Sequence, residues 1–222
     1  MTPLSKTNFA EMLRAARVMP IMTVRDVTQA VRTAEALAAG GLTMMEITLR
    51  TDVAVSAIRA IRDQVPGVII GAGTLLRRGD FARAADAGAQ FAVSPGLTDE
   101  LAQDAIQSAL PFLPGVQTAT DVMRALGYGF RELKFYPAKA AGGVEVLTDF
   151  SSIFPQVGWC PTGKIGRDDV ASYLALPTVL CCGGSWVAPQ DMQARGDWQG
   201  ISRLAASVGR NDKVGEPHVK VV

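Results

Sequence analysis

Short apolar runs alternate along this chain with longer segments in which apolar residues recur every three or four positions. The short runs span five to seven residues and have the length and flanking turn residues of β-strands. They lie at residues 18–24, 44–49, 68–73, 90–94, 111–115, 132–136, 157–161 and 178–183. The pattern therefore predicts eight strands.

Amphipathic helices are predicted between these strands. Residues 26–41 and 97–110 carry helical apolar faces, and Thr98 is the expected N-cap of the second segment. Residues 51–67 begin with a Thr-Asp capping signal and end at a Pro-Gly pair. A further helix is predicted at residues 8–17, before the first strand, and the C-terminal part of the chain also has a helical pattern.

The alternation of strands and helices is typical of a parallel sheet. Eight such units in 222 residues fit an α/β fold of the (β/α)8 TIM-barrel type, with the extra N-terminal helix covering the barrel bottom. An open, doubly wound sheet fits less well, because no G-x-G-x-x-G motif opens the first helix. We expect one barrel domain over residues 1–222, with a polar tail from about residue 211.

Composition adds constraints on the partners. The chain is 48% hydrophobic and 19% charged, with a formal net charge of +1. Because basic residues are not in excess, neither nucleic acid nor an anionic membrane surface is an expected partner. The N-terminus lacks a signal-peptide pattern, and no apolar run reaches the roughly 18 residues of a membrane span.

Cysteine and histidine are scarce. Cys160, Cys181 and Cys182 form no C-x-x-C pair, which disfavours a disulfide scaffold or thiolate metal site and favours a reducing, cytoplasmic location. The single histidine, His218, lies in the polar tail. A histidine-based triad or zinc site would have to recruit that residue, so no metal is predicted.

The active site of such a barrel is built where the strands end. On strand 44–49, alternation places Glu46, Thr48 and Arg50 on one side and the apolar residues on the other. The polar set should face into the barrel, where a charge requires a partner or a function. One interpretation is a buried Glu-Arg pair with a structural role, and the other is a catalytic acid beside a cation.

Lys134 is the most informative residue of strand 132–136. It shares a side with Tyr136, whereas Leu133 and Phe135 point the other way. Burial or a nearby cation such as Arg50 favours the neutral amine, which can attack a ketone and form a Schiff base. The alternative is a lysine that extends to solvent at the rim.

Glycine-rich loops follow the last two strands. CPTGKIGRDD and CCGGSW supply backbone amides that can approach an anion closely, at Gly163, Gly183, Gly184 and Ser185. Barrels often bind phosphate at this place, although ordinary turn glycines are an equal alternative.

The motifs EITLRT, GAGT, SPGLT, LPGV, LKFYPA, CPTG and CCGGSW occur in this order. Together they resemble the 2-dehydro-3-deoxy-phosphogluconate (KDPG) aldolases, the class I lyases of the Entner–Doudoroff route. The resemblance covers the chain to about residue 210. It implies a homotrimeric barrel without metal or cofactor that cleaves KDPG, a phosphorylated 2-keto acid, to pyruvate and glyceraldehyde 3-phosphate through a covalent lysine imine.

The resemblance also implies roles for individual residues. Lys134 would be the Schiff-base lysine and Glu46 the general acid/base. The substrate-binding residues it implies are Arg50 and Thr74 for the pyruvate carboxylate, Pro95 and Phe135 in the pocket, Thr162 for stereochemical preference, and Gly163, Gly184 and Ser185 for phosphate.

One position departs from the family pattern. Lys164 stands where a glycine is expected after CPTG, and it could strengthen phosphate binding or block a close backbone approach. Three alternatives stay open from the sequence: the same chemistry on 4-hydroxy-2-oxoglutarate or the galactonate-series phosphate, an isomerase or epimerase that uses Glu46 without covalent catalysis, and a non-catalytic binding protein.

Overall fold

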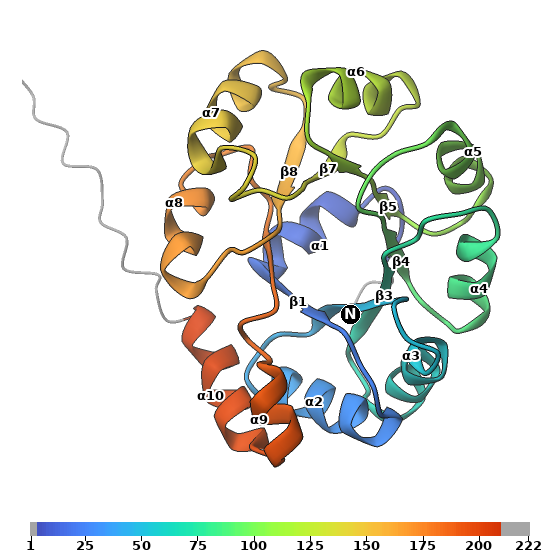
Figure 1. The fold of residues 1–222 in the computed structure, drawn as a ribbon, viewed down its shortest axis with the longest axis vertical. Coiled ribbons are helices and arrows are strands. Elements are labelled where there is room, and N and C mark those ends of the chain that lie inside the picture. Colours follow the sequence, from blue (N-terminus) through green and yellow to red (C-terminus); the bar gives the residue numbers. More distant parts are fainter. Residues whose placement is uncertain (1–3, 210–222) are drawn as a thin grey trace, which may run out of the picture.

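The computed structural model describes residues 4–209 and shows a ring of parallel strands surrounded by helices (Figure 1). The strands are β1 (Val18–Met22), β2 (Met44–Thr48), β3 (Ile69–Gly73), β4 (Phe91–Val93), β5 (Phe112–Leu113), β6 (Gly115–Val116), β7 (Glu132–Phe135), β8 (Gly158–Pro161) and β9 (Cys182–Gly184). All eight predicted strand segments are therefore confirmed, with shifted ends. The predicted tail from residue 211 and His218 lie outside the described residues.

Neighbouring strands of the ring are paired in parallel. Six strands are hydrogen-bonded in the order β5-β4-β3-β2-β1-β9, and three more in the order β6-β7-β8. Two isolated parallel bridges, Trp159 with Val179 and Thr162 with Gly183, connect β8 to the last strand. On the other side β5 and β6 are separated only by Pro114. These links close the (β/α)8 barrel.

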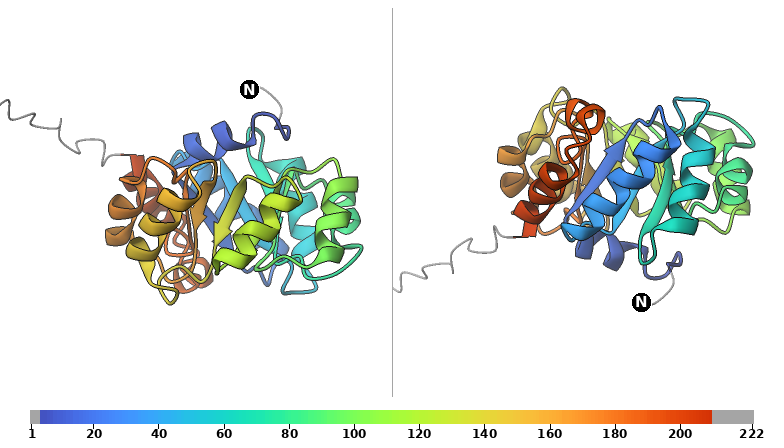
Figure 2. Two further views of the ribbon diagram at one scale, coloured as in Figure 1. Left: turned by 90° about the horizontal axis from the view of Figure 1, so that it is seen from above. Right: turned by 90° about the horizontal axis from the view of Figure 1, so that it is seen from below.

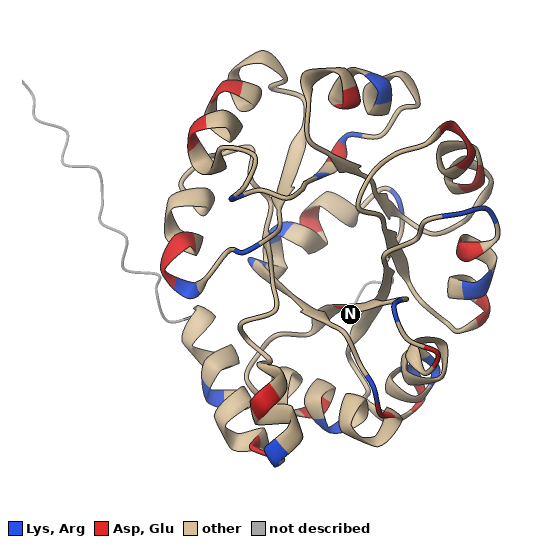
Figure 3. Ribbon diagram, viewed as in Figure 1, with Lys and Arg blue, Asp and Glu red and all other residues tan. Residues whose placement is uncertain are grey.

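Helices cover the outside of the ring. They are α2 (Val27–Ala39), α3 (Ala54–Gln64), α4 (Asp80–Asp86), α5 (Asp99–Gln107), α6 (Ala119–Gly127), α7 (Gly143–Ile153), α8 (Val170–Leu174), α9 (Gln190–Arg195) and α10 (Trp198–Gly209), with a short 3-10 turn η1 (Arg167–Asp169) before α8. Charged residues lie mainly on these helices and on the loops (Figure 3). Among residues 4–209, every helix is too short or too polar to span a lipid bilayer.

Strand alternation sorts the side chains into two environments, as β2 illustrates. Met45 and Ile47 point outward into the large apolar cluster between the sheet and the helices. Glu46 and Thr48 point inward and are almost fully buried, at 1% and 2% exposure. Because side chains alternate across a strand, one five-residue segment supplies both packing and the polar interior.

The lower interior of the barrel is apolar. The N-terminal helix α1 (Phe9–Ala16) lies across one end of the barrel (Figure 2), as predicted, and buries Phe9 and Leu13. Its partners inside the barrel are Met19, Met44, Ile69, Phe91, Val93, Leu113, Cys160, Leu180 and Cys181. This layer excludes water from the bottom and leaves the opposite end open for polar side chains.

Two local predictions need correction, and a third is confirmed. The single strand predicted at 111–115 is interrupted at Pro114, because proline has no N–H to donate to a neighbouring strand. The expected Thr-Asp cap of α3 is not formed: Val53 is the N-cap residue, and the Thr51 hydroxyl donates to the Val24 carbonyl at 2.7 Å. The Thr98 cap of α5 is confirmed, since its side chain accepts from Leu101 N–H.

Candidate active site

A pocket of about 530 Å³ opens at the carboxyl ends of the strands. Side chains from β2 and β7, two strands that lie across the ring from each other, reach it, and the loops after β1, β8 and β9 complete the wall. Of the residues predicted from the sequence, the pocket brings together Glu46, Arg50, Lys134, Thr162, Gly163, Gly184 and Ser185.

The centre of the pocket is a buried amine beside a buried carboxylate. Lys134 Nζ lies 3.6 Å from Glu46 Oε1, and the two side chains are 7% and 1% exposed. The ammonium position also lies over the Tyr136 ring, 5.4 Å from its centroid. Lys134 therefore points into the barrel, as the alternation predicts, and the interpretation of an outward-pointing lysine is wrong.

Packing, rather than hydrogen bonding, fixes the position of the Glu46 side chain. Both carboxylate oxygens are buried, and neither has a hydrogen-bond partner among residues 4–209. Gly73 at the end of β3 makes room for the carboxylate, because a β-carbon at that position would overlap it. Such an acid is available to exchange a proton with a molecule in the pocket.

Arg50 forms one side of the site and is hydrogen-bonded to Thr74. The Arg50 Nε donates to the Thr74 hydroxyl at 3.3 Å, and Thr74 itself has a left-handed backbone with φ of 62°. This conformation is uncommon for a β-branched residue. It places the hydroxyl where it accepts from the guanidinium, which lines the pocket as a donor for an anionic group.

A pair of threonine hydroxyls lies next to the acid. Thr48 donates to the Met22 carbonyl at 3.2 Å, so its oxygen is free to accept the hydroxyl of Thr23 at 2.9 Å. Both residues line the pocket. The pair ties the end of β1 to the end of β2 and fixes the wall beside Glu46.

The opposite side of the pocket is rich in glycine. Gly163 has a φ of 113°, and Lys164 follows it with a left-handed φ of 55°. Gly183 lies against Thr162, since a β-carbon on it would overlap that side chain. These loops bring backbone groups of Gly163, Gly184 and Ser185 to the pocket wall, which suits an anion.

Three predicted substrate-binding residues do not line this pocket directly. Phe135 is fully buried among the rings of Phe150 and Trp159, on the outer side of β7, so its side chain faces away from the site. Pro95 packs its backbone against Gly115. Thr74 is connected to the site through the hydrogen bond that it accepts from Arg50.

Several pocket residues were not assigned from the sequence. Thr23 follows β1 directly, so its position at a strand end was the available signal. Gln190 and Gln193 come from α9, and the Gln193 amide donates to the Ala188 carbonyl at 2.7 Å. No local pattern marks these glutamines, because their approach depends on how α9 folds over the pocket.

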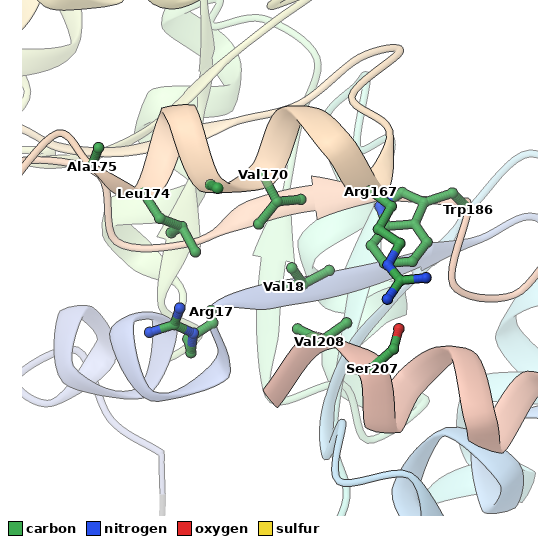
Figure 4. A pocket seen from close by; sticks show the side chains of 10 residues that line it. Arg17, Val18, Arg167, Val170, Leu174, Ala175, Trp186, Ser207 and Val208 are labelled. Atoms are coloured by element: carbon green, nitrogen blue, oxygen red, sulfur yellow. The ribbon is translucent and has the colours of Figure 1, made fainter. Parts of the chain in front are cut away.

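A second cavity of about 310 Å³ lies between α8 and α10 (Figure 4). Val18 lines it, with Arg17 toward one end and Arg167 beside Trp186 at the other. Trp186 lines both cavities, so its ring forms part of the wall between them. This cavity lacks the acid and the lysine that define the strand-end pocket.

No group of three or more histidine, cysteine, aspartate or glutamate side chains within residues 4–209 could hold a metal ion. The three cysteines are free and buried. Burial raises the pKa of the Cys182 thiol well above its usual range. The acid and the amine, rather than a thiolate, are therefore the reactive groups that this site offers.

Comparison with known proteins agrees with this chemistry. The family model for KDPG and KHG aldolase matches residues 9–204. The KHG/KDPG aldolase of Escherichia coli is 46% identical over 90% of this chain and 94% of its own. The chain belongs to the KDPG and KHG aldolase family.

Solved structures share the whole fold. A KDPG aldolase from Legionella pneumophila, with pyruvate captured as a covalent carbinolamine, has a TM-score of 0.87 and 41% identity over 90% of this chain and 97% of that one. The enzyme of Zymomonas mobilis with 3-phosphoglycerate has a TM-score of 0.87 and 42% identity over 91% and 96%.

Proposed function

We propose that this protein is a class I aldolase that cleaves 2-dehydro-3-deoxy-6-phosphogluconate to pyruvate and D-glyceraldehyde 3-phosphate through an imine on Lys134. The observation that carries the proposal is the buried Lys134 amine, 3.6 Å from the Glu46 carboxylate, at the strand ends of the barrel. Family membership and the carbinolamine captured in the Legionella pneumophila relative support the same chemistry.

The first half of the reaction forms the imine. The neutral Lys134 amine adds its lone pair to the C2 carbonyl carbon, and the carbonyl oxygen takes up a proton to give a carbinolamine. Loss of water then leaves a protonated imine. Glu46 is the nearest acid to this nitrogen, and its position suits the proton transfers that convert the hydroxyl into a leaving water.

The second half breaks the carbon–carbon bond. A base removes the proton of the C4 hydroxyl, the C3–C4 bonding pair moves into the imine, and the aldehyde leaves. The resulting enamine is protonated at C3, and water hydrolyses the imine to release pyruvate and the free lysine. No external oxidant, reductant or cofactor is required, because the imine nitrogen accepts and returns the electron pair.

Binding residues are assigned on the same basis. Arg50, supported by Thr74, would hold the carboxylate of the keto acid, and Thr162 would set the stereochemical preference. Backbone amides near Gly163, Gly184 and Ser185 would hold the distal phosphate. A homotrimer stays a prediction from the resemblance. The cytoplasmic location, the single domain and the absence of a metal requirement stay predictions from the sequence.

Borohydride trapping with pyruvate tests the proposal. Reduction of the imine should leave a stable adduct of pyruvate mass on the peptide that contains Lys134, with no adduct in Lys134→Ala. Lys139→Ala is a matched control, because Lys139 is exposed and paired with Asp169 at 3.2 Å. Aldol cleavage without any trapped adduct would refute the covalent route, and phosphosugar isomerisation in its place would support the non-covalent alternative.

A further inference from the structure

Lys164 occupies an unusual place in the candidate site. It lines the pocket directly after Gly163, and its backbone has a left-handed φ of 55°. Side chains with a β-carbon rarely adopt this conformation, and such outliers gather at ligand-binding positions. Of the three non-glycine residues with positive φ among residues 4–209, Lys164 lines the pocket and Thr74 is hydrogen-bonded to the pocket residue Arg50.

Lys164 also differs from the other charged groups of the pocket. Lys134 lies beside Glu46, and Arg50 is bonded to Thr74. Lys164 is exposed at the mouth and has no ion pair within 4.0 Å among the described residues. Asp169 on the following turn is paired with Lys139 instead. The Lys164 ammonium is therefore available to an anion that enters the pocket.

The charge of the ligand decides what such an ammonium contributes. Coulomb attraction scales with the charge of the anion, so a phosphate dianion gains about twice as much from the same ammonium as a carboxylate does. Backbone amides of the glycine-rich loops bind either anion, but they carry only partial charges. A full positive charge added to them raises the preference for the dianion.

We infer that Lys164 is a specificity-determining residue that favours 2-keto acids ending in a phosphate dianion over those ending in a carboxylate. The inference rests on the proposed function and adds a selective role for this side chain at the mouth. In this inference Lys164 binds the distal group of the substrate, at the other end from the carbon atom that Lys134 attacks, and it contributes to substrate binding rather than to the chemical step.

Steady-state kinetics of Lys164→Gln test the inference on two substrates, KDPG and 4-hydroxy-2-oxoglutarate. For KDPG, the KM is expected to rise about tenfold with kcat unchanged, a typical loss for one charge-assisted contact. The KM for 4-hydroxy-2-oxoglutarate should change by less than about twofold. Lys139→Gln removes a neighbouring exposed ammonium and should leave both KM values unchanged.

Two further measurements separate charge from backbone effects. Lys164→Gly removes the charge and relieves the positive φ, and it should raise the KM for KDPG as much as Lys164→Gln does. Below about pH 6 the phosphate takes up its second proton, so the ratio of variant to wild-type KM should shrink there. An unchanged or lower KM for KDPG in both variants, or an equal rise for both substrates, would overturn the inference.

Failure of this inference is distinguishable from failure of the proposed function. Pyruvate has no distal phosphate, so borohydride trapping on Lys134 should proceed equally in wild type and Lys164→Gln. If wild type traps pyruvate and the two variants keep the wild-type KM for KDPG, only the role of Lys164 is refuted. If wild type traps nothing, the aldolase proposal itself fails.

Discussion

The two ends of the barrel interior contrast sharply although the same strands build both. At the bottom, Leu13 of α1 packs with apolar residues such as Met44 and Phe91. Two residues further along β2, Glu46 is buried beside Lys134. Burying such charges is unfavourable. The comparison indicates that the bottom layer stabilises the fold and that the upper layer is arranged for reaction.

Replacing the amine should give the largest effect. Lys134→Ala is expected to lower kcat/KM for aldol cleavage by at least about 10³-fold, because Lys134 is the one buried lysine among the described residues that line the pocket. Its melting temperature should stay near that of wild type, since the bottom layer is intact. Coupled detection of pyruvate and a thermal melt measure the two quantities, and retained turnover would contradict the division of roles.

The acid at the upper end is expected to matter next. Glu46→Gln should lower kcat by roughly 10² to 10⁴-fold, the usual contribution of a general acid or base. Glu132→Gln is the matched control, because Glu132 begins β7 and lines a different cavity with Lys6 and Phe9 at the bottom. If both variants lose activity equally, position along the strand does not determine function.

A change in the bottom layer should affect stability and spare chemistry. Leu13 is fully buried, so Leu13→Ala is expected to lower the free energy of unfolding by about 2 to 5 kcal/mol. Below its melting temperature the variant should retain the wild-type kcat. Denaturant titration measures the loss, and Ile153→Ala, which truncates a side chain that is 63% exposed, is the control.

The smallest expected effect is a pH-dependent one at Glu132. Burial raises the pKa of this carboxyl above its usual value. The folded state therefore disfavours ionised Glu132, and this cost appears as the pH rises through the raised pKa. Glu132→Gln should melt slightly higher than wild type at pH 8 and equally at pH 4. A stabilisation confined to pH 4 would show the opposite sign.

Sequence reasoning identified the proposed catalytic pair because alternation on a strand is a local rule. The positions of Glu46 and Lys134 on inward faces followed from their neighbours on β2 and β7, whose outward residues Met45 and Leu133 join the outer core. The barrel itself followed from the eightfold alternation of strands and helices.

Contacts between residues far apart in the sequence could not be predicted from local patterns. Phe135 was assigned to the substrate pocket, yet its ring packs outward on Trp159, as its place in the alternation requires. Gln193 reaches the pocket from α9, which depends on tertiary packing alone. The interruption at Pro114 had a local signal, since proline cannot donate to the ladder, but the strand pattern around it concealed the break.

Gly73 has a consequence for attempts to redesign this site. The room for the Glu46 carboxylate is made on β3, by the absence of a single methyl group, rather than on β2 where the acid is attached. If position 46 is varied alone, its side chain must still fit the space beside the Gly73 backbone. We therefore expect that changing the length or acidity of the side chain at position 46 will require a second substitution at position 73, although Gly73 itself takes no part in the chemistry.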